Sequence, residues 1–193
     1  MPPRFIFVRH GEAEHNVAFH KDGASAFSNK AYKDANLTPT GIEQAQATKL
    51  QLADFTILDV WSSPLTRCIQ TAEELVDKSV KREYYLHDNL LECLGGHHVC
   101  NERKPKYELH KLYPNWNVKT LAEFPVYWVE REPEFSLHQR MFMFIQLLAD
   151  IYKEDDEESY ILIVSHHDVI RSFTGVSLKN AEYTIQTFEG LCS

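Results

Sequence analysis

The sequence predicts an α/β domain whose sheet is doubly wound and mainly parallel, with helices on both faces in three α/β/α layers. Short apolar runs rich in β-branched and aromatic residues alternate along the chain with segments of helical periodicity. The 193 residues can bury a sizeable core, and 44% hydrophobic with 25% charged residues is typical of globular proteins. We find no linker and no internal repeat, so we expect one domain over residues 1–193.

The strands are predicted from the apolar runs, which are too short for helices. We expect them at residues 5–8, 58–61, 82–87, 160–165 and 183–188, with 82–87 at an edge of the sheet. The acidic stretch 154–158 is expected to be a solvated connection before the fourth strand.

The helices are predicted from their start signals and their 3.6-residue period. Thr38 and Ser63 are expected N-caps, and Pro39 and Pro64 are expected first helical residues. A longer helix over about 134–152 carries a Met and Phe stripe that we assign to the core. The first two helices are expected to pack on the sheet through Ile42, Ala45 and Leu52, and through Leu65, Ile69, Ala72 and Val76.

Two histidines follow predicted strands directly. His10 comes after 5–8 and His166 after 160–165, and ligands of open α/β sheets bind at the carboxyl ends of strands. Arg9 beside His10 favours an anionic substrate over a metal ion, because a guanidinium stays charged and repels cations. Arg67 is expected in the first turn of the helix that Ser63 and Pro64 open, where backbone donors favour phosphate. The pattern therefore indicates phosphoryl transfer through a histidine.

With these motifs in order, the chain resembles the histidine phosphatase superfamily, also called the phosphoglycerate mutase-like family, over nearly its whole length. Residues 92–103 are also similar to a segment of plant and fungal mutase-like proteins. The motifs that carry the family resemblance are Val8-Arg9-His10-Gly11-Glu12 with His15-Asn16, Leu37-Thr38-Pro39-Thr40-Gly41 with Gln44-Ala45, Ser63-Pro64-Leu65-Thr66-Arg67 with Gln70-Thr71-Ala72, Leu91-Glu92, and Val164-Ser165-His166 with Ile170-Arg171.

The resemblance implies a role for each matching residue. His10 is implied as nucleophile, Glu92 as general acid, and Arg9, Asn16, Arg67 and His166 as phosphate ligands. Cationic neighbours are expected to lower the pKa of His10 and keep it neutral for attack, whereas His166 is expected to gain a proton when a phosphate dianion binds. Glu92 can act as an acid if burial raises its pKa; its alternative is a solvated loop carboxylate.

The chain departs from the family pattern at His167-Asp168, where glycine usually follows the second histidine. His167 either contacts the substrate or turns away and caps the next helix, and we favour capping. The irregular insert over about 88–133 is expected to be a substrate-selecting cap. Within it, His97 and His98 are expected at the pocket rim or as plain loop residues, and Arg103 with Lys104 either holds a second anionic group or is surface charge.

Composition excludes several classes of function. The net charge of −8 argues against nucleic-acid and anionic-membrane binding, and no apolar run is long enough to span a membrane. Neither His-Glu-x-x-His nor Cys-x-x-Cys occurs, so no metal and no cofactor is expected. Without a secretion signal, a cytoplasmic location is expected, and the four cysteines are expected to remain thiols, with Cys68 an inert helix residue.

These observations favour a phosphomonoester hydrolase that acts on a small phosphorylated metabolite or a phosphoprotein. Two alternatives remain open. One is a phosphoglycerate mutase-type phosphotransferase, although the insert has no paired-arginine motif. The other is a catalytically weak module that binds a phosphorylated ligand. The departure from the family pattern at His167 leaves this alternative open. No oligomeric state and no single substrate follow from the sequence.

Overall fold

The computed structural model describes residues 4–125, 130–153 and 159–192, and in this part of the chain the strands form one five-stranded sheet in the order β3-β2-β4-β1-β5. Their bounds are β1 (Arg4–Arg9), β2 (Thr56–Ser62), β3 (Tyr84–Leu86), β4 (Ser159–Ser165) and β5 (Tyr183–Gln186). The strands β1 to β4 are parallel, and β5 pairs with β1 in the antiparallel sense. The prediction of a mainly parallel sheet is confirmed.

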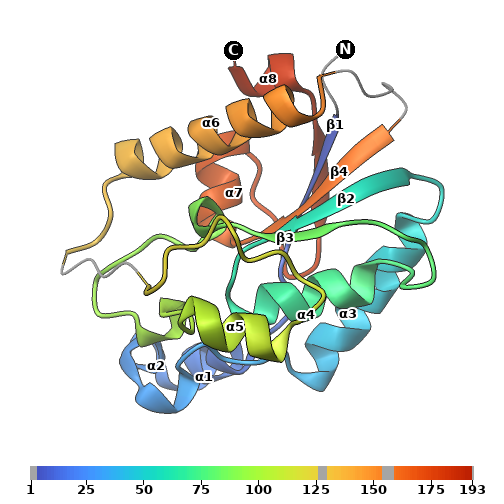
Figure 1. Cartoon of the computed structure of the whole chain (residues 1–193). Coiled ribbons are helices and arrows are strands. Elements are labelled where there is room, and N and C mark those ends of the chain that lie inside the picture. The colour runs from blue at the N-terminus through green and yellow to red at the C-terminus, as the bar shows by residue number, and fades with distance from the viewer. Residues whose placement is uncertain (1–3, 126–129, 154–158, 193) are drawn as a thin grey trace.

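Helices cover both faces of this sheet, as Figure 1 shows: α6 and α7 lie on one side, and α3 and α4 on the other. Alternation along β1 explains the layering, because Phe5 and Phe7 join the core under α6 and α7 while Ile6 and Val8 join the core under α4. The three layers are confirmed. The helices of the described residues are α1 (Glu14–Asp22), α2 (Ser25–Ser28), α3 (Pro39–Gln51), α4 (Thr66–Leu75), α5 (Lys106–Leu112), α6 (Glu134–Ile151), α7 (His167–Thr174) and α8 (Phe188–Cys192), with short 3-10 turns η1 (Lys30–Tyr32), η2 (Asp88–Leu90) and η3 (Val99–Asn101).

The two predicted Pro-initiated helices turn out differently. In α3 the Thr38 hydroxyl accepts the Gly41 N–H at 3.0 Å and Pro39 is the first residue, as predicted, although Ile42 is exposed. The prediction that Ser63 caps the next helix and Pro64 starts it is wrong, because α4 begins at Thr66.

A distant carboxylate replaces the local cap of α4. Asp34 accepts the Thr66 N–H at 2.7 Å and the Thr66 hydroxyl at 2.7 Å, which satisfies the first amide of the helix. Ser63 is thereby free to serve another partner, described below. Asp34 is 32 residues away from Thr66 in the sequence, so no local pattern predicts this cap.

The remaining differences concern element lengths. The strand predicted at 82–87 is only Tyr84–Leu86, and the strand predicted at 183–188 ends at Gln186 because α8 begins at Phe188. Part of the insert predicted at 88–133 packs into the core. Leu109 of α5 and Trp116 are buried in the core cluster under α4, so part of the insert stabilises the main body of the molecule.

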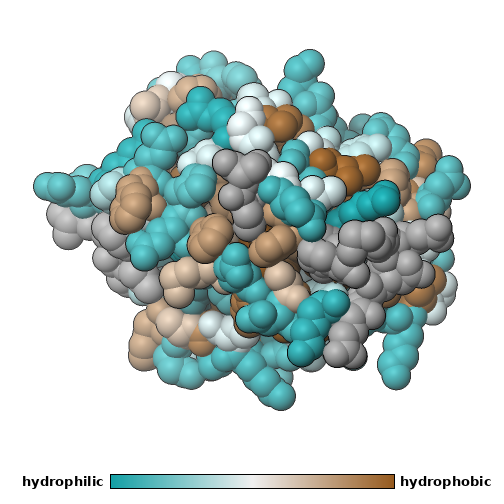
Figure 2. All heavy atoms as spheres, turned by 90° about the horizontal axis from the view of Figure 1, so that it is seen from above, coloured by the Kyte–Doolittle hydropathy of each residue, from teal (hydrophilic) through white to brown (hydrophobic). Residues whose placement is uncertain are grey.

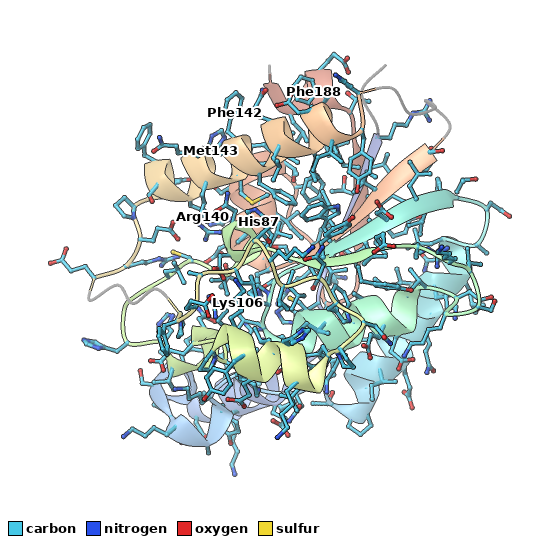
Figure 3. All side chains as sticks on the ribbon, in the orientation of Figure 1. His87, Lys106, Arg140, Phe142, Met143 and Phe188 are labelled. Carbon is cyan, nitrogen blue, oxygen red and sulfur yellow. The ribbon has the colours of Figure 1, made fainter. Side chains whose placement is uncertain are left out.

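The outer side of α6 is partly apolar. Phe142 and Met143 are exposed there, while Arg140 lies on the side of the helix that faces the loops near His87 (Figure 3). Figure 2, seen from above, shows hydrophobic residues scattered among hydrophilic ones over this face. No helix of the described residues has the length and apolar character that a membrane span requires.

Candidate functional site

A pocket of about 360 Å³ lies beside the carboxyl ends of the parallel strands β1, β2 and β4. His166 lies next to it, with its ring centroid 5.2 Å from that of His10. The structure therefore brings together residues that are far apart in sequence. The sequence-predicted residues that line the pocket are Arg9, His10, Asn16, Arg67, Glu92, His98 and His167.

His10 is held in one orientation at the end of β1. The backbone N–H of His10 donates to the Ser165 carbonyl at 3.0 Å. The ring nitrogen Nδ1 lies 2.7 Å from the Gly11 carbonyl oxygen. Because a carbonyl only accepts, Nδ1 carries the proton and Nε2 carries the lone pair. Burial, followed by the charges of Arg67 and of nearby His15, lowers the pKa of His10 well below its usual value. His10 is thus neutral, with Nε2 available as a nucleophile.

Gly11 follows His10 because the backbone leaves no room for a side chain. A Cβ at Gly11 would lie 2.4 Å from the Gly41 carbonyl oxygen, and a Cβ at Gly41 would lie 2.1 Å from the Glu12 carbonyl oxygen. The loop after β1 therefore packs backbone to backbone against the first turn of α3. The Gly11 N–H donates to Thr71 Oγ1 at 3.0 Å, which ties the same loop to α4.

Both ring nitrogens of His166 have protein partners. Nη2 of Arg67 lies 3.3 Å from Nδ1, so Nδ1 accepts, and Nε2 lies 2.8 Å from the Ser63 hydroxyl. Cys68 Sγ is 3.4 Å from Nε2. Burial and the charge of Arg67 lower the pKa of His166 well below its usual value. His166 is therefore neutral in this structure, and a phosphate oxygen has to replace one of these contacts to reach it.

Arg67 is a buried cation in a fixed position. Its Nη1 donates to the Cys100 carbonyl at 2.8 Å and its Nη2 donates to Asn101 Oδ1 at 3.0 Å. Arg9 is fixed by an Nη1 donation to the Leu178 carbonyl at 2.9 Å. The Nε–H of each arginine is buried without an acceptor in the described part of the chain. Unpaired buried donors are costly, and an anion in the pocket supplies acceptors for them.

His15 and Asn16, at the start of α1, lie beside these arginines. Asn16 Oδ1 accepts the Ala13 N–H at 3.0 Å, and its Nδ2 lies 3.2 Å from His15 Nε2. Burial and the charges of Arg67 and Arg9 lower the pKa of His15 to about 2. His15 is a neutral partner that orients the Asn16 amide.

Glu92 follows η2 and lines the opposite wall of the pocket. Its Oε1 accepts the Cys93 N–H at 2.8 Å, and burial, reinforced by the charge of Asp168, raises the pKa of Glu92. The loop is held by Arg140 of α6, which donates to the carbonyls of Asn89 and Glu92 and pairs with the buried carboxylate of Glu132 at 2.9 Å. The raised pKa favours a protonated carboxyl group that can donate.

The structure contradicts the predicted role of Arg103 and Lys104 in holding a second anionic group. Arg103 does not face the pocket: its guanidinium pairs with Asp88 at 2.7 Å and donates to backbone carbonyls of the insert, with no exposed side-chain surface. Lys104 pairs with Asp34 at 2.5 Å. Of the two histidines expected at the pocket rim or as loop residues, His98 lines the pocket, whereas His97 is exposed, has a positive φ of 60° and does not line it.

His167 does not cap α7. It is the first residue of that helix and it lines the pocket, with ring nitrogens 3.1 Å from Asp168 Oδ1 and 3.0 Å from the Ser177 hydroxyl. The capping interpretation is therefore wrong, and the side chain points toward the site. The reason is the acceptor supplied by Asp168, which holds the ring beside the pocket mouth.

Phe27 and Arg131 also line the pocket, and no motif in the sequence points to them. Phe27 and His98 form an aromatic wall with ring centroids 5.0 Å apart, and Phe19 stacks on Phe27 at 4.9 Å. Arg131 and Asp168 line the mouth, 3.0 Å apart. These residues lie on loops and short helices, so their convergence depends on tertiary packing. Within the described residues no three His, Cys, Asp or Glu side chains are grouped closely enough to hold a metal ion.

Comparison with known proteins gives one consistent result. The model of the histidine phosphatase superfamily (branch 1) matches residues 5–190. A phosphoglycerate mutase-like protein of Arabidopsis thaliana is 28% identical over 86% of this chain and 73% of its own length. The rat protein 6-phosphofructo-2-kinase/fructose-2,6-bisphosphatase 3 is 30% identical over 93% of this chain, which spans only 29% of that protein.

The solved structures agree on the fold. The crystal structure of a putative α-ribazole-5′-P phosphatase from Escherichia coli superposes with a TM-score of 0.63 at 20% identity, covering 96% of this chain and 90% of the other. The matched residues include the two histidine-bearing strand ends, Arg9 and Arg67. This chain belongs to the histidine phosphatase superfamily, branch 1.

Proposed function

We propose that the protein is a phosphomonoester hydrolase that works through a phosphohistidine at His10. The observation that carries this proposal is the fixed tautomer of His10. The Gly11 carbonyl oxygen lies 2.7 Å from Nδ1 and holds the proton there, which leaves the lone pair on Nε2. We call the part of the pocket around His10, Arg9, Arg67 and Asn16 the phosphate end. Arg9 and Arg67 lie in the same pocket, each with a buried Nε–H that has no acceptor among the described residues. A neutral nucleophile among cations suits an anionic phosphorus centre.

In the first step Nε2 of His10 attacks phosphorus and the bond from phosphorus to the ester oxygen breaks. Arg9, Arg67 and Asn16 donate to the equatorial oxygens. His166 exchanges its Ser63 contact for a phosphate oxygen, to which it donates its Nε2–H while it stays neutral. Glu92 is the acid: burial raises the pKa of its carboxyl group, and the protonated group gives its proton to the leaving oxygen.

In the second step the resulting Glu92 carboxylate takes a proton from a water molecule as that water attacks phosphorus. The nitrogen–phosphorus bond breaks, and its electron pair returns to Nε2 of His10. Inorganic phosphate leaves and Glu92 is protonated again, so the cycle closes without a metal or other cofactor.

We propose a small phosphorylated metabolite as the substrate, with a phosphoprotein as the second candidate. A pocket of about 360 Å³ is within the range for small-molecule sites. Relatives named for phosphatase activity, such as a probable phosphatase of Schizosaccharomyces pombe that is 36% identical over 45% of this chain, support hydrolysis over phosphoryl transfer between metabolites.

Phosphate release from a panel of phosphomonoesters, with a chelator present, tests this function. We expect the intact protein to release phosphate and His10→Ala to release none. The matched control is His110→Ala, which removes an exposed histidine of α5 and should behave as the intact protein. Unchanged release by His10→Ala would rule out the nucleophile, and transfer of the phosphoryl group to an added alcohol without net release would favour the mutase alternative.

A further inference from the structure

A second cavity of about 310 Å³ adjoins the candidate site and shares Cys93, Arg131 and Asp168 with it. None of the residues that hold the phosphate end lines this second cavity. It lies next to the Glu92 segment, because Cys93, which follows Glu92 in the chain, lines both cavities and accepts from Arg131 Nε at 3.4 Å. In the proposed reaction, this is the side on which the leaving group departs.

Asp168 lies where the two cavities meet and contacts three basic side chains. Its Oδ2 lies 3.0 Å from Arg131 Nη2, and its Oδ1 lies 3.1 Å from His167 Nδ1 and 3.9 Å from Arg171 Nη2. Two arginines share this one carboxylate, so Asp168 alone does not neutralise both guanidinium groups. The Arg131 side chain is 65% exposed and that of Arg171 is 58% exposed, so both can be reached by a ligand.

Two further carboxylates line the second cavity, and neither forms an ion pair with Arg131. Glu132 is buried and paired with Arg140 at 2.9 Å, while Glu134 is exposed at the start of α6. Exposed ion pairs such as Arg131 with Asp168 are weak, so an anionic ligand can compete for the guanidinium. Arginine presents a planar fork that binds carboxylate or phosphate oxygens in pairs.

An unpaired donor also points to a ligand. The Ser172 hydroxyl oxygen is buried and has no hydrogen-bond partner among the described residues, and Ser172 lines the same cavity. Buried hydroxyl groups are nearly always satisfied, so a polar atom bound in the cavity would supply the missing contact.

We propose that this second cavity is the leaving-group subsite for substrates that carry a second anionic group close to the phosphate ester, with Arg131 as its direct ligand. The inference rests on the proposed function and specifies its substrate class: a phosphorylated hydroxy acid or a bisphosphate rather than a singly charged ester. In this proposal Arg131, and not Arg103 with Lys104, holds the second anionic group.

The test compares 2-carboxyethyl phosphate with 3-hydroxypropyl phosphate, which share a primary alkyl leaving group and differ in the carboxylate. We expect kcat/KM of the intact protein to be higher for the carboxylate by about tenfold or more, the value of one charge-assisted contact. In Arg131→Gln the ratio should fall to about one. Lys78→Gln, which removes an exposed lysine far from both cavities, is the matched control and should keep the full ratio.

Two further measurements separate this inference from the proposed function. p-Nitrophenyl phosphate reports hydrolysis without a second anion: if it is hydrolysed but the carboxylate gives no advantage, or Arg131→Gln keeps the advantage, the subsite is refuted alone. If no ester is hydrolysed, the proposed function fails, and calorimetric titration decides the subsite instead. Tighter binding of 3-phosphonopropionic acid than of propylphosphonic acid, lost in Arg131→Gln, supports it; equal binding overturns it.

Discussion

The two ends of the pocket are built in different ways. At the phosphate end, His10, Arg67 and His166 come from the carboxyl ends of β1 and β4 and from the first turn of α4, and each is almost fully buried. At the leaving-group end, Glu92 and Arg131 come from loops of the insert, and the Arg131 side chain is 65% exposed.

This difference separates chemistry from selection. Buried groups on strands and a helix hold one geometry, which the transfer of a phosphoryl group requires whatever the substrate. Exposed groups on loops can change between relatives without disturbing that geometry. We therefore expect substitutions at the phosphate end to affect all substrates alike, and substitutions at the leaving-group end to affect them unequally.

The largest expected effect is on stability at the leaving-group end. Arg140→Met leaves the Glu132 carboxylate buried and unpaired, which costs about 3–5 kcal/mol of unfolding free energy. Urea unfolding measures this loss. In the double variant Arg140→Met with Glu132→Gln, most of the loss should be recovered; an equal loss in both would show that the charge pair does not hold this loop.

At the phosphate end, Arg67→Gln should lower kcat/KM by about 10²–10³-fold, because one fixed donor to the transferring group is lost. The loss should be the same for aryl and alkyl phosphates, since Arg67 does not contact the leaving group in the proposed reaction. Steady-state kinetics on both ester types checks this, and a loss confined to one type would break the division between the two ends.

Glu92→Gln is expected to discriminate where Arg67→Gln does not. Turnover of an alkyl phosphate should fall by about 10²-fold, because its alkoxide needs a proton, whereas p-nitrophenyl phosphate should lose much less. The ratio of the two kcat values is the measurement. Equal losses for both esters would assign Glu92 a binding role.

The smallest effect per group is the dependence of stability on pH. His10, His15, His87 and His166 have folded-state pKa values below the usual 6.5, with His15 at about 2 and His87 at about 4. The unfolded chain therefore binds more protons below pH 6.5, and stability falls as the pH drops from 6.5 toward 4.

Each of these histidines contributes up to about 1.4 kcal/mol per pH unit in that window. The raised pKa of Glu92 acts in the opposite sense, but it is one group against four. Urea unfolding at pH 7 and pH 5 should show a clear loss at pH 5, and His110→Ala should show the same loss. Equal stability at both pH values would contradict the burial of neutral histidines.

Sequence reasoning succeeds where function follows regular structure. The apolar runs before His10 and His166 predict parallel strands, and parallel strands end at the same edge of a sheet, so the phosphate end follows from the pattern. It fails where a partner comes from far away. Asp34 rather than Ser63 caps α4, and the Ser63 hydroxyl contacts His166 instead.

The leaving-group end shows why the insert could not be read residue by residue. Arg103 and Arg131 are both arginines in an irregular stretch, and nothing local distinguishes them. Tertiary packing does: Asp88 and backbone carbonyls surround Arg103, whereas Asp168 of α7 holds Arg131 at the pocket mouth. The capping prediction for His167 fails for the same reason, because its contacts with Asp168 and Ser177 appear only in the folded chain.

Trapping the phosphorylated protein is the most direct measurement of the chemistry at the phosphate end. The intact protein is mixed with a ³²P-labelled phosphomonoester, quenched in alkali within one turnover, digested and mapped. We predict an acid-labile, alkali-stable label on the peptide that contains His10, and no label in His10→Ala. Label on another residue, or full phosphate release with no labelled intermediate, would contradict a phosphohistidine at His10.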